Sequence, residues 1–247
     1  MVPRIGATTR PMRQFLLLSA LAAAPAAADD RSFALGSFDR VRVEGPFKVA
    51  ITTGSPGAKA RADRGTLDRL SITANGGTLV VRMGGAGWAE QPRLARATVP
   101  EITLSTPRLA AIAISAGAEV AASTMKGPRV DLTVTGPGTL KVARVEAEQL
   151  VGTLIGSGAM TLAGKAGNAR LSLNGTGTIA APELIADNAT VRLEGPGEIA
   201  THARFAAQVT STGLGRVTVA GSPKCTVRAP AGGPVTCGVG DTNIRSN

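Results

Sequence analysis

A Gly-x-Gly element is the feature that most constrains the fold, because it recurs at an almost fixed distance through the second half of the chain. Each copy precedes alternating apolar and polar residues, as in Thr135–Val142, and a weaker copy at Ser115–Ala122 has Ala in both glycine places. The first small residues of successive copies are 20, 20, 19, 20 and 18 residues apart. Such a period is typical of a repeat architecture. The glycines concerned are Gly136, Gly138, Gly156, Gly158, Gly175, Gly177, Gly195, Gly197, Gly213 and Gly215.

The residues around each element fall into apolar columns when the copies are aligned on the first small residue. The position two places before it is aliphatic in five of the six copies. Alternation with period two on both sides of a corner predicts two short strands, each with one buried face. The position four places after the first small residue is apolar in every copy: Val120, Leu140, Met160, Ile179, Ile199 and Val217.

These columns predict an all-β fold, a single-stranded parallel β-helix (β-solenoid) with coils of about 20 residues. Glycine at the corner permits positive φ and lets stacked corners approach closely. On the remaining side of the coil, Met125, Val145 and Leu184 fit an inward position, whereas Lys165 does not. A mature chain of this length would make ten or eleven coils and stand about 50 Å tall at about 4.8 Å per coil.

The N-terminal half has strand patterns without the glycine repeat. Alternation over 38–54 and over 70–83 predicts two strand–turn–strand units, and Asp63–Gly65 is expected to be a turn. A Gly-rich loop at 84–92 holds the single tryptophan, Trp88. An exposed tryptophan there is either a binding group or a cover for the nearest apolar edge.

Residues 1–28 have the pattern of a signal peptide. Met12, the better candidate for the start, leads a short basic segment, then the apolar run Phe15–Ala24, and Ala26–Ala28 forms an A-x-A cleavage site. The run is too short for a transmembrane helix, which needs about 20 apolar residues. We therefore expect a chain that is not an integral membrane protein, with residues 29–247 forming one exported domain.

The two cysteines, Cys225 and Cys237, flank a segment with turn residues at its centre. In an oxidising compartment this arrangement predicts a disulfide. The closed loop and the polar tail 240–247 are expected to cap the C-terminal end of the solenoid, since terminal strands otherwise pair with other chains. A zinc site would need further ligands, and His202 is distant in sequence.

The chain is basic, with a formal net charge of +10, and its arginines are scattered. This charge favours acidic partners, such as an anionic polysaccharide or lipid head groups, although a solvated surface also explains it. Nucleic acid is disfavoured, because aromatic residues are only 2% of the chain and no basic run occurs. The candidate anion contacts are Arg170, Arg192 and Arg216.

No catalytic, metal or cofactor motif emerges. Acidic residues in the repeats occur singly, and Glu146 and Glu148 fit a solvated face. Calcium-binding repeats carry Asp two places after the second glycine, where this chain has an apolar residue. No helix follows the glycines, so dinucleotide binding is not expected. We expect no catalytic residues, no metal and no cofactor.

The chain resembles the GIN-domain family of exported bacterial proteins (DUF2807 type), described as auto-transporter adhesin head domains. The resemblance runs from Phe38 to Cys237 and depends on Phe38–Gly45, Val49–Gly54, Pro107-x-Leu109 and the Gly-x-Gly coils. The Gly-Ile-Asn triplet that names the family corresponds to Gly45-Pro-Phe47, where only the glycine matches. The resemblance implies a right-handed parallel β-helix with an adhesin-like or structural role.

Three functions are compatible with the sequence. The first is a non-enzymatic exported scaffold or adhesin-like domain that contacts an unknown macromolecule of the cell envelope or surface. The second is a binding module for an anionic polysaccharide or lipid head groups through stacked arginines. The third is a carbohydrate-active enzyme. The expected location is the periplasm or cell surface of a Gram-negative-type bacterium.

Overall fold

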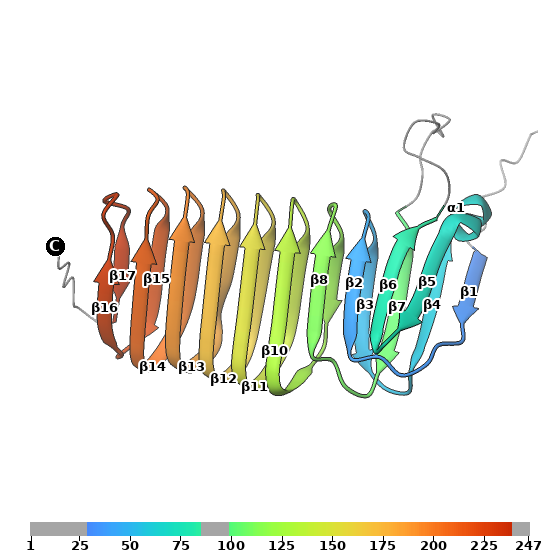
Figure 1. Ribbon diagram of the computed structural model, residues 1–247, viewed down its shortest axis with the longest axis horizontal. Coiled ribbons are helices and arrows are strands. Elements are labelled where there is room, and N and C mark those ends of the chain that lie inside the picture. Colours follow the sequence, from blue (N-terminus) through green and yellow to red (C-terminus); the bar gives the residue numbers. More distant parts are fainter. Residues whose placement is uncertain (1–28, 85–98, 239–247) are drawn as a thin grey trace, which may run out of the picture.

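The computed structural model describes residues 29–84 and 99–238 and is nearly all β. Its strands form a 17-stranded sheet wound into a solenoid of about six turns with stacked coils (Figure 1). The predicted β-solenoid is therefore confirmed, but the predicted ten or eleven coils are wrong. The N-terminal residues form short parallel strands, antiparallel strands and one helix instead of further regular coils.

The regular part of the solenoid is a stack of parallel coils. Each coil has a post-corner side, a middle side and a pre-corner side, which in β12 are residues 159–162, 164–167 and 168–174. Neighbouring coils pair along nearly their whole length, with Leu140 next to Met160 and Met160 next to Ile179. The strands are β10 (Met125–Thr135), β11 (Thr139–Ile155), β12 (Ala159–Asn174), β13 (Thr178–Glu194) and β14 (Glu198–Ser211).

The core is the interior of the stack and consists of aliphatic columns. Leu140, Met160 and Ile179 form one of these columns, and all three are completely buried. Parallel in-register stacking places like residues on like, which explains the repetition of the apolar positions along the chain. Burial of this apolar surface is the main contribution that holds successive coils together.

The Gly-x-Gly corners lie along one edge of the stack (Figure 1). The first glycine has positive φ in four of the five Gly-x-Gly corners, for example 89° at Gly136 and 110° at Gly195, and Gly213 is the exception. The second glycine makes a close backbone approach, since a Cβ on Gly197 would lie 2.6 Å from the carbonyl oxygen of Gly177. Most first glycines are also closely stacked, since a Cβ on Gly195 would lie 2.8 Å from the carbonyl oxygen of Gly175. Close stacking thus requires glycine at both positions, and positive φ is a second requirement at the first.

The strands β2 (Arg40–Glu44) and β3 (Lys48–Thr53) do not pair with each other, contrary to the predicted strand–turn–strand unit. They are two sides of one coil, and Gly45–Phe47 is its corner. β2 pairs in parallel with β6 and β8, and β3 pairs in parallel with β7 and β9. The first coil of the chain therefore lies between two coils made later: β6 (Thr78–Met83) with β7 (Glu101–Thr106), and β8 (Ala111–Ser115) with β9 (Glu119–Ala122).

Antiparallel strands surround this N-terminal end. The predicted unit at 70–83 is confirmed, because β5 (Leu70–Asn75) pairs antiparallel with β6 across a Gly-Gly turn. β4 (Gly57–Ala62) pairs antiparallel with β7, and β1 (Asp29–Phe33) pairs antiparallel with β4.

The turn predicted at Asp63–Gly65 is wrong, because a short helix, α1 (Arg64–Arg69), begins there. Asp63 is its N-cap, and its Oδ1 accepts a hydrogen bond of 3.0 Å from the Thr66 backbone N–H. Hydrogen bonds from the Thr66 hydroxyl and backbone lower the pKa of Asp63. The capping bond satisfies a backbone donor that the first turn of a helix leaves unpaired.

The C-terminal end is made by β15 (Arg216–Gly221), β16 (Lys224–Arg228) and β17 (Val235–Cys237). A disulfide joins Cys225 to Cys237, as predicted. The predicted signal peptide, nearly all of the Gly-rich loop with Trp88, and the polar tail at 240–247 lie outside the described residues.

Candidate interaction surface

The middle side of the solenoid is recessed at β12, because this coil has one residue fewer than its neighbours at the preceding bend. Two residues separate Val142 from Val145 in β11, whereas one separates Leu162 from Gly164 in β12. In the stack, Gly164 therefore lies between Val145 and Leu184. An alignment of the coils without a gap would place Lys165 at this position. The Gly164 backbone approaches Val145 too closely for a Cβ.

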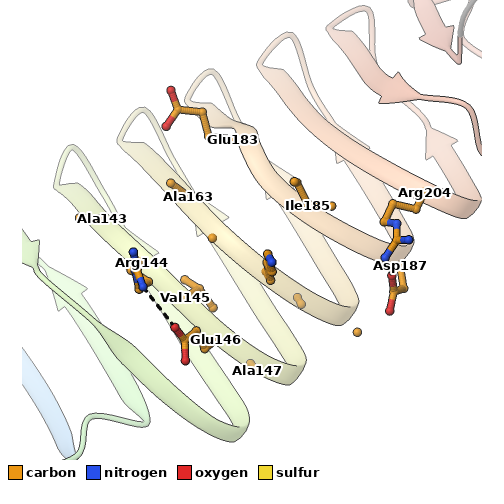
Figure 2. Close-up of a pocket in the computed structure, with 14 residues that line it drawn as sticks. Ala143, Arg144, Val145, Glu146, Ala147, Ala163, Glu183, Ile185, Asp187 and Arg204 are labelled. Atoms are coloured by element: carbon orange, nitrogen blue, oxygen red, sulfur yellow. Dashed lines mark hydrogen bonds and ion pairs between the residues drawn. The ribbon is translucent and has the colours of Figure 1, made fainter.

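The recess forms an open depression of about 1010 Å³ between β11 and β13 (Figure 2). Its floor consists of small residues of β11 and β12, including Ala147, Ala163 and Ala166. Charged side chains from four successive coils surround this floor: Arg144, Glu146, Lys165, Glu183, Asp187 and Arg204. The depression thus has both charge signs at its border.

Two of its carboxylates are bonded to cations. Glu146 lies 3.1 Å from Lys126 Nζ and 3.6 Å from Arg144 Nη1, and Asp187 lies 3.1 Å from Arg204 Nη1. The hydrogen bond from Lys126, followed by the charges of Lys126 and Arg144, lowers the pKa of Glu146. Glu146 therefore remains ionised at neutral pH, and its pKa is shifted away from the range that a general acid requires.

An exposed aromatic ring lies next to this border. Phe205 is 59% exposed, and the Arg204 guanidinium carbon lies 4.8 Å from its ring centroid. The same guanidinium also pairs with Asp187, so it is held between a carboxylate and a ring. An exposed ring with a cation above it presents both apolar area and charge to a binding partner.

The described residues contain no cluster of three or more His, Cys, Asp or Glu side chains that could hold a metal ion. Their one helix, α1, is far too short to cross a bilayer. Neither Glu148 nor His202 lines the depression.

The three arginines expected to bind anions do not form one stack. Arg170 and Arg192 lie on the pre-corner side of neighbouring coils, in adjacent outward rows. Arg216 lies on the post-corner side, where it is next to Glu198 in the register. All three are exposed, and Arg192 is bonded to Glu194 at 2.8 Å.

Sequence reasoning did not identify the depression, although one signal for it was present. The repeat spacing falls from 20 to 19 residues between Gly156 and Gly175, which is the coil that contains β12. A coil that is shorter by one residue must lie further inward than its neighbours or take a shorter path at one of its bends. The spacing falls further, to 18 residues, between Gly195 and Gly213, in the coil that contains β14 and contributes Arg204 to the depression.

Comparison with protein families identifies most of the stack, up to the end of β15. Residues 37–223 match the family described as "Putative auto-transporter adhesin, head GIN domain" (DUF2807). The chain belongs to this family. The match includes the first coil, the Gly-x-Gly coils and the depression, so the surface described above is part of a GIN domain.

Solved structures of similar fold include an adhesin-type protein from Bacteroides fragilis and two proteins from Parabacteroides distasonis. The first, described as a "putative adhesin", is 19% identical, has a TM-score of 0.74, and covers 86% of this chain and 94% of its own. The second, described as a "putative lipid binding protein", is 18% identical, has a TM-score of 0.66, and covers 87% and 95%. The third, a "putative adhesin", is 18% identical, has a TM-score of 0.67, and covers 86% and 97%.

These structures share the fold at low identity, and comparison with curated proteins gives no match. The family and its structural neighbours fit an adhesin-like domain, which is typical of an extracellular or surface protein.

Proposed function

We propose that this GIN domain is a non-enzymatic, exported, adhesin-like module that binds a macromolecule of the cell envelope or cell surface. The observation that carries the proposal is the state of two of the three carboxylates that line the depression at β12. Glu146 and Asp187 are bonded to cations, and the pKa of Glu146 is lowered. Glycoside hydrolysis requires a pair of carboxyl groups, one of them with a raised pKa.

The solenoid also supplies what a binding module needs. Its outward side chains form rows that continue from coil to coil, so a partner can contact equivalent positions along the stack. Because each coil is fixed by its neighbours, the rows are preorganised and lose little conformational entropy on binding. The adhesin descriptions of the family and of two similar structures agree with this function. The predicted signal peptide supports export to the periplasm or cell surface.

The test uses the protein purified from its producing cells, immobilised and exposed to envelope and surface fractions of those cells. We expect saturable retention of a macromolecule that is lost when the protein is unfolded by heat. We also expect no release of reducing ends or unsaturated sugars from any retained polymer. Turnover of a polymer that disappears in Glu183→Gln or Glu146→Gln would overturn the non-enzymatic assignment, and absence of retention from every fraction would overturn the binding function.

A further inference from the structure

The pre-corner side of the last four strand segments is a continuous face with its own composition. It is formed by residues 168–174 of β12, 188–194 of β13, 206–211 of β14 and 224–228 of β16, which pair in parallel. We call it the arginine face. Figure 1 shows these strands side by side at the C-terminal end of the stack.

The arginine face carries four basic residues, Arg170, Arg192, Lys224 and Arg228, and one acidic residue, Glu194. All four basic residues are exposed. Among the residues that the structure describes, only Arg192 of these four forms an ion pair. Its partner Glu194 also accepts a hydrogen bond of 3.0 Å from Asn174, so the single carboxylate is already occupied.

The register places the three arginines in adjacent rows. Arg192 and Arg228 occupy one outward row, separated by Thr210. They are thus two coils apart, a distance of about 10 Å at the spacing of parallel strands. Arg170 lies one coil before Arg192 in the neighbouring row. The cations are therefore distributed along the solenoid axis and do not form a single compact cluster.

The positions between the cations are filled by neutral hydrogen-bonding side chains. Hydroxyl and amide groups both donate and accept, so they suit a ligand rich in hydroxyl groups. The outward residues of the face include no aromatic or large aliphatic side chain that could insert into a lipid surface. The neutral hydrogen-bonding residues are Asn168, Ser172, Asn174, Asn188, Thr190, Gln208, Thr210 and Thr226.

We infer that the arginine face binds an acidic polysaccharide that lies along the solenoid axis, with its anionic groups against Arg170, Arg192 and Arg228. The inference rests on the proposed binding function and names its partner. A linear polymer whose charges recur along its length matches cations that lie on three of the four strands of the face, β12, β13 and β16. Its hydroxyl groups match the threonine, serine and amide side chains between them. Guanidinium groups bind carboxylates and sulfates in a bidentate geometry, which adds orientation to charge.

The post-corner side supplies a matched control. Lys48, Lys141 and Arg216 are exposed there, and they form no ion pair within the described part of the chain. The triple variant Arg170→Ala, Arg192→Ala, Arg228→Ala and the triple variant Lys48→Ala, Lys141→Ala, Arg216→Ala remove the same charge from different sides. Equal thermal unfolding temperatures would establish that both variants fold.

The experiment measures binding of the full chain to polygalacturonate, to neutral dextran, and to vesicles of phosphatidylglycerol and phosphatidylcholine, at 0.15 M and 0.3 M salt. We expect binding to polygalacturonate only, weakened at least tenfold in the arginine-face variant and less than twofold in the control variant. Because isolated surface charges are strongly screened at these concentrations, affinity that persists at 0.3 M salt indicates contacts beyond net charge.

Three results would overturn the inference. Equal losses in both variants would indicate net charge alone, and binding to the vesicles in preference to polygalacturonate would indicate a lipid surface. Retention of an envelope macromolecule by both variants, without binding to polygalacturonate, would reject the acidic polysaccharide and leave the proposed function intact. If the unmodified chain retained no macromolecule from the envelope fractions, the proposed function itself would be rejected.

Discussion

Two corners of similar sequence differ at the position of the second corner glycine, and this difference shows why that glycine is needed. The corner between β2 and β3 is Glu44-Gly-Pro-Phe-Lys48, and the corner between β13 and β14 is Glu194-Gly-Pro-Gly-Glu198. The first glycine has positive φ in both, 138° at Gly45 and 110° at Gly195. At the position of the second corner glycine, the β2–β3 corner has Phe47, which is fully buried, and the β13–β14 corner has Gly197.

The neighbouring coil accounts for this difference. Gly197 stacks on Gly177, where a Cβ would meet both the Gly177 carbonyl oxygen and Leu173 Cδ2 at 2.6 Å. Phe47 belongs to a coil whose neighbour on one side, β6–β7, has the long connection 84–100 in place of a tight corner. The turn itself thus tolerates a large side chain, and the glycine is required by close stacking. From the N-terminal coil onward, this position is Phe47, Ala118, Gly138, Gly158, Gly177, Gly197 and Gly215.

Among the variants that test this comparison, we expect Gly197→Ala to lose the most stability. The new methyl group has to displace backbone of the adjacent coil, so we expect a loss of several kcal/mol in the free energy of unfolding. Chemical denaturation followed by circular dichroism measures it.

Gly138→Ala is the matched control for that variant. A Cβ on Gly138 would lie 2.8 Å from Ile114 Cγ2, which is the end of a side chain, and 3.1 Å from the Ala118 carbonyl oxygen. Because a side chain can move more easily than stacked backbone, we expect a smaller loss than at Gly197. Equal losses at both positions would indicate that the turn conformation, rather than stacking, requires the glycine.

An intermediate effect is expected at the C-terminal end, where the disulfide closes a loop between residues 12 apart in sequence. Reduction of Cys225–Cys237 should cost about 3 kcal/mol in the free energy of opening the last coil. Hydrogen exchange should show lost protection in β16 and β17 and unchanged protection in β2 and β3, because coils contact only their neighbours. Loss of protection that extends to β2 and β3 would contradict the nearest-neighbour description.

The smallest effect on stability is expected in the weaker repeat, Ser115–Ala122, which lies between the β2–β3 coil and the Gly-x-Gly coils. Ala116 occupies the first corner position with φ of 59° and is the one non-glycine residue with positive φ in the described ranges 29–84 and 99–238. We expect Ala116→Gly to raise the free energy of unfolding by up to about 1 kcal/mol, because it removes the strain of a left-handed alanine. A lower unfolding temperature in this variant would indicate that the methyl group contributes packing that outweighs the strain.

The C-terminal half of the fold could be predicted from the sequence because its contacts are local and repetitive. Leu140, Met160 and Ile179 were aligned by their distance from the corner glycines, and the structure stacks them in that register. On the middle side, Lys165 did not fit the inward position, and the structure gives the reason: the shorter coil places Gly164 there. Alignment by residue type cannot detect such a deletion, whereas the spacing of the glycines can.

The N-terminal half could not be predicted in the same way. Alternation correctly indicates the strands β2 and β3, but it contains no information about their partners, which lie far along the chain in β8 and β9. The similarity of Glu44-Gly-Pro46 to Glu194-Gly-Pro196 was the available signal that 45–47 is a corner.

The same limitation applies to the candidate anion contacts. Arg170 and Arg192 precede a corner and Arg216 follows one, so their positions relative to the glycines already separate them. Arg228, two coils from Arg192 in the same row, lies beyond the last Gly-x-Gly copy and was therefore not aligned with it.

The position of β2–β3 between two later coils also sets the order in which the chain can assemble. A chain that emerges with its N-terminus first exposes β2 and β3 as single strands until β6 to β9 have followed, because all their parallel partners lie there. Each coil from β10 onward needs only a partner about 20 residues away and can add as soon as it emerges. Since distant pairing is slow and local pairing is fast, we expect the coils from β10 onward to form before the pairing of β2 and β3 is complete.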